Sequence, residues 1–284
     1  MSLKSGLVLE GGAMRGMFTA GVLDVLLENN INVDGFIGVS AGATFGCNYK
    51  SRQIGRTIRY NIRFAGDKRY CSLHSFFKTG DLYNVDFCYN QIPNVLDVFD
   101  LKTFKENPVK FYVVASDCNS GLPVYKELET CDEKDLTWMR ASASMPLVSR
   151  IVEIDGHKLL DGGMTDSSPI RKFEEMGYGK NIVVLTQPRD YVKKPASLMG
   201  LMKIFLRKYP NLIDAMKKRH ITYNEEKNYV FNKAARGELV VICPKKPLDI
   251  SRTEKNPNEL IRDYEEVRIT ALEKLPEIKE FLAK

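Results

Sequence analysis

Residues 34–43 read DGFIGVSAGA, and this stretch decides the fold. Its first part, residues 34–39, is predicted to form a short buried strand. The small residues after it make a tight turn, and a helix is predicted to follow. A strand, a tight turn and a helix in this order make one unit of an α/β fold with a parallel sheet.

The same unit precedes this stretch. Residues 6–10 (GLVLE) predict a strand, residues 11–16 (GGAMRG) form a glycine-rich turn, and residues 17–29 carry apolar side chains at helical spacing. Asp155-Gly156 predicts a two-residue hairpin turn. The sequence therefore predicts an α/β fold, with a central, mainly parallel sheet flanked by helices and a helical C-terminal region. The remaining predicted elements are strands at 110–116, 151–154, 157–160, 181–186 and 239–243, and a charged helix at 258–284, bent or broken near Pro276.

The composition is that of an ordinary globular protein. The chain has 284 residues, of which 44% are hydrophobic and 27% charged. No run approaches the roughly 18 consecutive apolar residues of a membrane span, and the first residues lack the pattern of a signal peptide. We therefore expect a cytoplasmic protein that is at most peripheral to a membrane.

Ser40 lies at the centre of a G-x-S-x-G motif, Gly38-Val39-Ser40-Ala41-Gly42. A nucleophilic serine placed between a strand and a helix sits in a strained turn with its hydroxyl exposed. The N-terminus of the helix beyond it favours developing negative charge. The alternative is an ordinary strand-to-helix turn in which the serine only caps the helix. The motif in this context favours the nucleophile.

The glycine-rich turn at residues 11–16 also follows a strand and opens a helix. Such a turn points backbone N–H groups at an anion, which is either a nucleotide phosphate or the oxyanion of a reaction. The dinucleotide pattern G-x-G-x-x-G is missed because the third position is Ala13. An oxyanion hole next to Ser40 agrees better with the sequence, since neighbouring parallel strands place both turns at one edge of the sheet.

A serine nucleophile needs a base, and two kinds of residue are available. His220 is the candidate if the order is that of an α/β-hydrolase, but its neighbours Lys217-Lys218-Arg219 indicate a solvated basic surface. His157 lies in the predicted hairpin, which suggests a structural role. Asp161 ends a predicted strand and precedes Gly162-Gly163. From these residues alone, a turn aspartate and a catalytic aspartate are equally good interpretations.

Together these motifs resemble those of the patatin-like phospholipase family, in its bacterial branch. The resemblance rests on residues 10–16 (EGGAMRG), 38–42 (GVSAG) and 161–163 (DGG), in this order. Residues 141–146 (ASASMP) are similar to the small-residue segment of the family. The core of the resemblance covers residues 6–185.

The resemblance implies a Ser–Asp dyad. Ser40 would attack the ester carbonyl, and Asp161 would take its proton and return it to the leaving alcohol. The backbone N–H groups of Gly11, Gly12 and Ala13 would form the oxyanion hole, with Arg15 supporting the loop. Ala13 replaces a glycine of the family pattern. Its methyl group is compatible with the loop if φ is negative there, and it is expected to narrow the hole.

A basic segment occupies residues 188–236, which carry twelve Lys and Arg against four Asp and Glu. It includes the apolar and basic run SLMGLMKIFLRK at 197–208. Residues 197–219 are compatible with contact to an anionic membrane surface, with a lid over the active site, or with a helix packed on the core. No nucleic-acid-binding motif is present. No Cys and His residues have metal-ligand spacing, so we expect neither a metal nor another cofactor.

We place a boundary near residue 190, between a catalytic α/β domain (1–190) and a basic helical region (191–284) packed on or capping it. The predicted activity is hydrolysis of lipid carboxyl esters, of the phospholipase A or lysophospholipase type. Two alternatives stay open. One is an acyltransferase or general carboxylesterase with the same dyad, and the other is a nucleotide-binding or scaffold protein with an inert serine.

Overall fold

The computed structural model describes residues 3–284 and contains one eight-stranded sheet. Its strands run in the order β5-β6-β3-β2-β1-β7-β8, with β4 paired to β3. The strands are β1 (Lys4–Leu9), β2 (Gly35–Val39), β3 (Lys110–Asp117), β4 (Pro123–Leu128), β5 (Val152–Ile154), β6 (His157–Asp161), β7 (Tyr178–Val184) and β8 (Leu239–Ile242).

The middle of the sheet is parallel. Strands β3, β2, β1, β7 and β8 pair in parallel, whereas β4, β6 and β5 are antiparallel to their partners. Leu9 at the end of β1 is in register with Gly38 near the end of β2. The turns after these two strands therefore meet at one edge of the sheet, as the sequence predicts.

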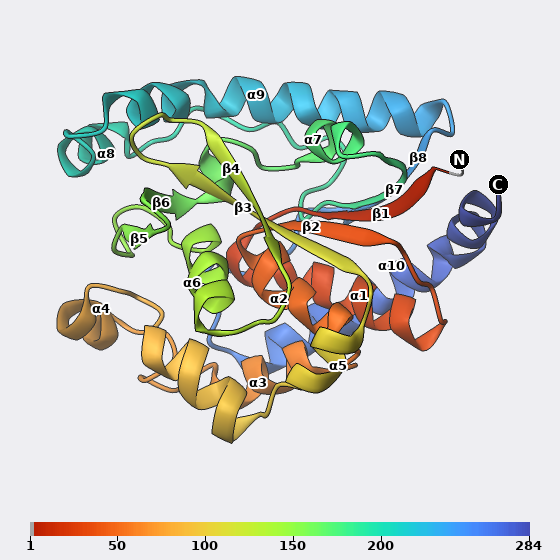
Figure 1. Ribbon diagram of the computed structural model, residues 1–284, viewed down its shortest axis with the longest axis horizontal. Helices are drawn as coiled ribbons and strands as arrows, with labels where there is room; N and C mark the ends of the chain where they lie inside the picture. Colours follow the sequence, from red (N-terminus) through yellow and green to blue (C-terminus); the bar gives the residue numbers. More distant parts are fainter. Residues whose placement is uncertain (1–2) are drawn as a thin grey trace.

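Helices cover both faces of the sheet (Figure 1). Helices α1, α2 and α10 lie on one face, and α7 and α9 lie on the other. The helices are α1 (Met17–Glu28), α2 (Ala41–Lys50), α3 (Arg56–Phe64), α4 (Leu73–Thr79), α5 (Leu101–Glu106), α6 (Glu133–Ser142), α7 (Ile170–Glu175), α8 (Met199–Phe205), α9 (Pro210–Ala235) and α10 (Pro257–Ala283), with short turns at Ala13–Gly16 and Gly162–Met164 and a π-helical segment at Phe87–Leu96.

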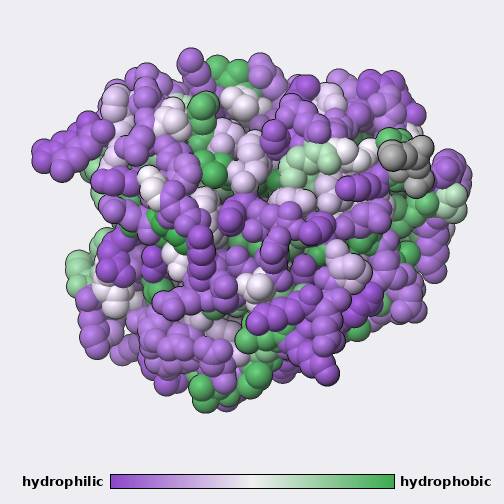
Figure 2. All heavy atoms as spheres, in the orientation of Figure 1, coloured by the Kyte–Doolittle hydropathy of each residue, from purple (hydrophilic) through white to green (hydrophobic). Residues whose placement is uncertain are grey.

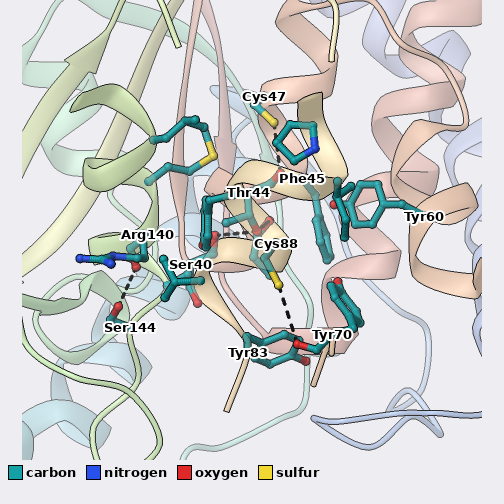
Figure 3. Close-up of a pocket in the computed structure, with 18 of the residues that line it drawn as sticks. Ser40, Thr44, Phe45, Cys47, Tyr60, Tyr70, Tyr83, Cys88, Arg140 and Ser144 are labelled. Carbon is teal, nitrogen blue, oxygen red and sulfur yellow. Dashed lines mark hydrogen bonds between the residues drawn. The ribbon is translucent and has the colours of Figure 1, made fainter. Parts of the chain in front are cut away.

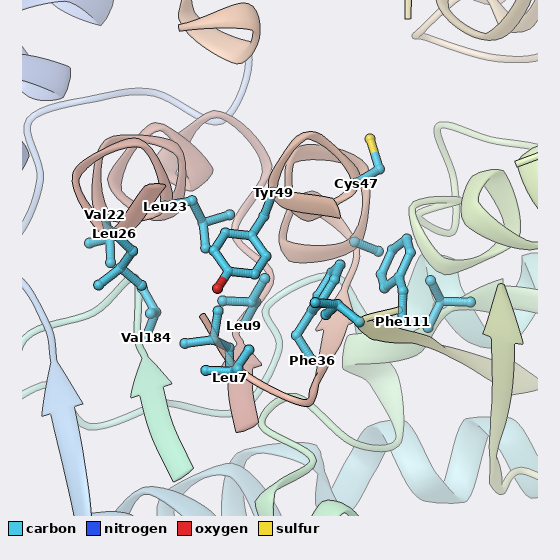
Figure 4. Packing of buried hydrophobic residues seen from close by; sticks show 14 of the residues in the cluster. Leu7, Leu9, Val22, Leu23, Leu26, Phe36, Cys47, Tyr49, Phe111 and Val184 are labelled. Carbon is cyan, nitrogen blue, oxygen red and sulfur yellow. The ribbon is translucent and has the colours of Figure 1, made fainter. Parts of the chain in front are cut away.

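The two faces bury separate apolar layers. On one face, Leu7 and Leu9 of β1 meet Val22 and Leu26 of α1 (Figure 4). On the other, a second cluster joins the sheet to α7 and α9, and it includes the stacked rings of Phe173 and Tyr178. The strands of the parallel core are therefore apolar on both sides, which is why they read as continuous apolar runs in the sequence.

The predicted α/β architecture is confirmed, with three local differences. Strand β4 was not predicted from the sequence. It begins with Pro123, its apolar and polar residues do not alternate clearly, and it is only partly buried. Helix α10 continues through Pro276 and is not broken there. Strand β8, from the C-terminal region, pairs with β7 in the main sheet. The hairpin turn is as predicted, with positive φ at Asp155 (50°) and Gly156 (79°).

A buried pair of carboxyl groups joins helix α9 to the loop after β6. Burial raises the pKa of Asp166, which accepts a hydrogen bond from the Tyr125 hydroxyl at 2.7 Å. Burial, followed by repulsion from Asp166, also raises the pKa of Glu226 on α9. The folded protein therefore holds a proton on this pair that the unfolded chain releases above its ordinary carboxyl pKa, near 4.

Because of this pair, we expect the free energy of unfolding to fall as the pH rises from about 4 through the raised pKa values of the folded state. In this range the folded state binds more protons than the unfolded state. Glu226→Gln keeps the shape and a hydrogen-bonding group without the charge. We expect it to increase the free energy of unfolding at pH 8 by on the order of 1 kcal/mol, and less at pH 5. Chemical denaturation at both pH values measures the difference, and an equal change at both would contradict this account.

Candidate functional site

Ser40 occupies a strained turn between β2 and α2. Its backbone has φ 55° and ψ −119°, a combination that L-residues rarely adopt and that costs on the order of 1–3 kcal/mol. The Ser40 N–H donates a 2.9 Å hydrogen bond to Oγ of Ser142, at the end of α6. An ordinary helix cap does not need this strain, and the Ser40 side chain makes no capping hydrogen bond to α2. The geometry is that of a nucleophile elbow.

The two glycines of the motif allow the close backbone approach that the turn requires. A Cβ at Gly42 would lie 2.3 Å from the carbonyl oxygen of Leu9, and a Cβ at Gly38 would lie 2.6 Å from that of Gly42. Neither contact is possible for a real side chain. The motif therefore serves to pack the turn against the end of β1, where the glycine-rich loop begins.

Asp161 is buried at the end of β6, opposite Ala115 of β3. Its Oδ1 accepts a 2.8 Å hydrogen bond from the N–H of Gly163. Burial raises the pKa of Asp161, and hydrogen bonding from the Ser40 side chain and the positive charge of Arg219 partly oppose this rise. The predicted nucleophile and the predicted base are thus neighbours, and both residues are buried.

The segment at residues 141–144 forms hydrogen bonds with both Ser40 and Asp161. Ser142 bonds the backbone of Ser40, and the carbonyl oxygen of Ser144 accepts a 2.8 Å hydrogen bond from the N–H of Asp161. Both serines are buried. The sequence showed only a run of small residues here and did not reveal that this segment contacts both Ser40 and Asp161.

The glycine-rich loop lies directly beside Ser40. A Cβ at Gly11 would lie 2.9 Å from Cβ of Ser40. Within residues 3–284, the backbone N–H groups of Gly11, Gly12 and Ala13 donate no hydrogen bond, and all three residues line a cavity that Ser40 also lines. Free backbone donors next to a nucleophile are what an oxyanion hole requires.

Glu10 precedes this loop and is held by hydrogen bonds to two distant parts of the chain. Its carboxylate accepts hydrogen bonds from the N–H of Thr186 (2.6 Å) and from the hydroxyl of Tyr223 on α9 (2.7 Å). Burial lowers the pKa of Arg15, and Glu10 opposes that shift by its negative charge. Arg15 has a buried Nε without a hydrogen-bond partner among the described residues. It lines the same cavity, in agreement with a supporting position next to the loop.

Ala13 does not have the negative φ that would make its methyl group compatible with the loop: φ is 52°. The backbone of Ala13 therefore adopts the left-handed conformation, which costs an L-residue roughly 1–2 kcal/mol. The family glycine would adopt this conformation without strain.

Ala13→Gly is expected to retain the N–H donor and relieve the strain. Because glycine also gives the unfolded chain more freedom, the net gain in the free energy of unfolding should be below about 1 kcal/mol. We expect kcat to stay equal or to rise. Ala215→Gly, inside helix α9, is the matched control and should lose about 1 kcal/mol. Denaturation curves and esterase rates for both variants check this, and a loss of stability from Ala13→Gly equal to the control would contradict it.

Two cavities meet at Ser40. The smaller one, about 180 Å³, is lined mainly by aromatic, aliphatic and thiol side chains. Phe45, Tyr60, Tyr70 and Tyr83 gather on one side of Ser40 (Figure 3). The larger cavity, about 500 Å³, is lined by the glycine-rich loop and Asp161. Only the larger one has several basic side chains close together, namely Arg15, Lys193, Lys194, Arg219, His220 and Arg252.

The basic run on α9 divides between the surface and this cavity. Lys217 is exposed and pairs with Asp214 at 2.6 Å, and Lys218 is exposed. Arg219 is half-buried, and its Nε donates a hydrogen bond to the carbonyl oxygen of Gly163. The interpretation of residues 217–220 as one solvated surface is therefore wrong, because the helix turns Arg219 and His220 toward the cavity.

The two other candidate bases, His157 and His220, lie at different distances from the site, and only His220 lines the cavity of Ser40 and Asp161. His157, in the hairpin, has its Nδ1 3.0 Å from Oδ2 of Asp117 at the end of β3, as expected for a structural residue. His220 lines the larger cavity, but its Nδ1 is buried and has no partner among residues 3–284. Within the same residues, no group of three or more His, Cys, Asp or Glu side chains is placed to hold a metal ion.

Comparison with known proteins gives two family matches. The model of the patatin-like phospholipase family matches residues 7–173, which is more than half of the chain. A domain of unknown function, DUF6363, matches residues 209–283. The two matches fall on either side of the basic loop that follows β7.

Individual relatives are distant. The uncharacterized protein YjjU of Escherichia coli is 25% identical over 85% of this chain and 69% of its own. The lysophospholipase NTE1 of Cryptococcus neoformans is 28% identical over 66% of this chain, which spans 12% of that protein. Among solved structures, VipD from Legionella pneumophila aligns with a TM-score of 0.43 and 11% identity, over 96% of this chain and 67% of its own.

Proposed function

This chain belongs to the patatin-like phospholipase family, and we propose that it is a serine acyl hydrolase that cleaves carboxyl esters of lipids, of the phospholipase A or lysophospholipase type. The observation that carries the proposal is the meeting of three features in one cavity. These are the strained Ser40, the buried Asp161 beside it, and the unpaired N–H groups of residues 11–13.

In the proposed mechanism, Ser40 Oγ attacks the ester carbonyl while its proton passes to Asp161. The N–H groups of Gly11, Gly12 and Ala13 stabilise the oxyanion, and loss of one such donor typically costs about 10²–10³ in rate. Asp161 then returns the proton to the leaving alcohol, and a water molecule hydrolyses the acyl-enzyme with Asp161 again acting as base. The raised pKa of Asp161 makes it a better proton acceptor than an ordinary carboxylate.

The two cavities suggest how a lipid is placed. The aromatic and aliphatic lining of the smaller cavity suits an acyl chain. The larger cavity, lined by loop backbone and basic side chains, suits the alcohol part of the ester. An acyl chain in the smaller cavity would bring its carbonyl group to Ser40, which lines both.

The proposed activity is tested by incubating the protein with a bacterial lipid extract and with defined lysophospholipids. Mass spectrometry of released fatty acid measures hydrolysis, and Ser40→Ala is the control. Release of fatty acid that depends on Ser40 supports the hydrolase. Transfer of the acyl group to an added alcohol in preference to water supports the acyltransferase. No turnover of any ester, together with nucleotide binding at the loop, supports the inert alternative.

We also propose that residues 197–219 contact an anionic membrane surface. Within residues 3–284, no helix has the length and apolar character needed to cross a bilayer. Helix α8 exposes Leu201, Ile204 and Phe205, and α4 at the same end of the molecule exposes Leu73 and Phe77 (Figure 1). Hydrophobic side chains interrupt a mainly hydrophilic surface at this end (Figure 2). The exposed Lys203, Arg207 and Lys208 add positive charge.

Lys203→Glu combined with Lys208→Glu is expected to weaken binding to anionic vesicles. Each cation near such a surface contributes about 1 kcal/mol, so the two reversals should lower the affinity by at least about tenfold at low salt. Hydrolysis of a short soluble ester should not change. Vesicle sedimentation at two salt concentrations measures the effect. Binding that is absent, or that is independent of salt and of both reversals, would overturn the membrane contact.

A further inference from the structure

We propose that the larger cavity contains a subsite for the phosphomonoester head group of a lipid, formed by Lys193, Arg219 and Arg15 with Arg252 at its rim. The inference rests on the proposed function, because it assigns the head-group side of the same site. It goes further by stating that the protein selects an anionic head group over a zwitterionic or uncharged one.

Positive charge in this cavity is only partly neutralised by the protein. Among the described residues, no carboxylate other than those of Glu10 and Asp161 lines the cavity. These two negative charges face the four cations of the subsite, and Glu10 also accepts hydrogen bonds from Thr186 and Tyr223, as Asp161 does from Gly163. Within residues 3–284, none of the four cations forms an ion pair, and the Nε of Arg15 is buried without any hydrogen-bond partner.

The environment of Lys193 shows how strongly the cations interact. The pKa of Lys193 is lowered to about 8, mainly by burial and also by repulsion from Arg219, Arg15 and Arg252, against the attraction of Glu10. Cations held together in excess of their counterions are stabilised when a further anion binds among them. A phosphate oxygen among Lys193, Arg15 and Arg219 would satisfy these groups by charge-assisted hydrogen bonds.

The same geometry disfavours a choline head group. A quaternary ammonium group is bound by aromatic rings or by free carboxylates. The aromatic rings beside this cavity are already occupied, since Lys193 Nζ lies 4.1 Å from the centre of the Tyr223 ring and 6.0 Å from that of Tyr191. A second cation would displace Lys193 and meet the charges of Arg219 and Arg15. A head group with negative charge only is therefore preferred.

The position of the subsite agrees with its use by a substrate. Arg219 bonds the carbonyl oxygen of Gly163, two residues after Asp161, and Arg15 belongs to the turn that carries the N–H groups of residues 11–13. A phosphate bound here lies in the larger cavity, and Ser40 lines both this cavity and the aromatic one. One glycerol unit can then join a phosphate in the larger cavity to an ester carbonyl at Ser40.

Binding of ether lipids tests the subsite without any hydrolysis. The wild-type protein is titrated by calorimetry with three soluble octyl ethers of glycerol, which carry a phosphate, a phosphocholine or a free hydroxyl group. We expect the phosphate compound to bind at least about tenfold more tightly than the other two, or about 1.4 kcal/mol. Lys193→Met should remove most of this preference, and the exposed Lys246→Met, which also removes one positive charge, should retain it.

Each outcome of these titrations either supports or overturns the proposed subsite. Equal affinities for the three ethers, or tighter binding of the phosphocholine compound, would overturn the subsite. Inorganic phosphate should compete only weakly with the phosphate ether. If its affinity equals that of the ether, the cavity is a site for the free ion, and the head-group assignment is overturned. Because no ligand contains a carboxyl ester, a preserved preference without any carboxylesterase activity would refute the proposed function alone. Esterase activity without the preference would refute this inference alone.

Discussion

Ser40→Ala is expected to lower kcat/KM for a soluble p-nitrophenyl ester by at least about 10⁴-fold, because it removes the nucleophile and leaves only the oxyanion hole and substrate binding. The fold should not change, since alanine accepts the same backbone and the hydrogen bond to Ser142 uses the backbone N–H of residue 40. Steady-state rates and a denaturation curve measure both. A well-folded variant with more than about a tenth of the wild-type rate would exclude Ser40 as nucleophile.

Asp161→Asn tests the other member of the dyad. The amide cannot accept the serine proton, and loss of a positioned base typically costs about 10²–10⁴ in rate. Because burial raises the pKa of Asp161 above its ordinary value of 3.8, the wild-type rate should fall on the acid side at a pH above that value. The activity of Asp161→Asn should lack this acid limb. His220→Gln is the matched control and should retain the limb, whereas a loss of the limb only in the His220 variant would make His220 the base.

Gly42→Ala is expected to have the largest effect on stability. The added methyl carbon would lie 2.3 Å from the carbonyl oxygen of Leu9, which belongs to the central strand and cannot move away. Overpacking of this kind costs about 1–3 kcal/mol, and this contact with backbone should reach or exceed the upper end. The turn that holds Ser40 would also shift, so kcat should fall as well.

Gly200→Ala is the matched control for this change. Gly200 lies in helix α8, and a Cβ there would meet nothing within 4 Å. The substitution should stabilise the protein by about 0.5–1 kcal/mol through helix propensity. Chemical denaturation of both variants measures the difference. A Gly42→Ala protein as stable and as active as Gly200→Ala would show that the close approach of β1 to the turn has no importance.

The sequence was sufficient for the fold because its central strands are buried on both sides. Runs such as residues 6–9 and 35–39 have no polar alternation, and glycine-rich turns mark their ends. Partly buried elements carry no such signal. Strand β4 lies antiparallel beside β3, and its mixed residues 123–128 read equally well as a loop.

The candidate site was predictable where a motif states a local geometry. The strain at Ser40 and its closeness to Gly11 follow from two turns at the ends of neighbouring parallel strands. Long-range contacts were not predictable. The direction of Arg219 depends on how a 26-residue helix docks over the sheet, and the role of Ser142 depends on a contact across 102 positions of the chain. The positive φ of Ala13 also goes against the local preference of alanine, so only the structure reveals it.

The most direct test of the central claim is covalent labelling of the native protein with a fluorophosphonate, followed by mass spectrometry of its peptides. Such reagents react with a serine that is activated by a base and faces an oxyanion hole. The proposed site predicts one modified residue, Ser40, with labelling strongly reduced in Asp161→Asn and unaffected by chelators. Modification of a different serine, or an unlabelled Ser40 in a folded protein, would contradict the claim that Ser40 and Asp161 form a catalytic dyad.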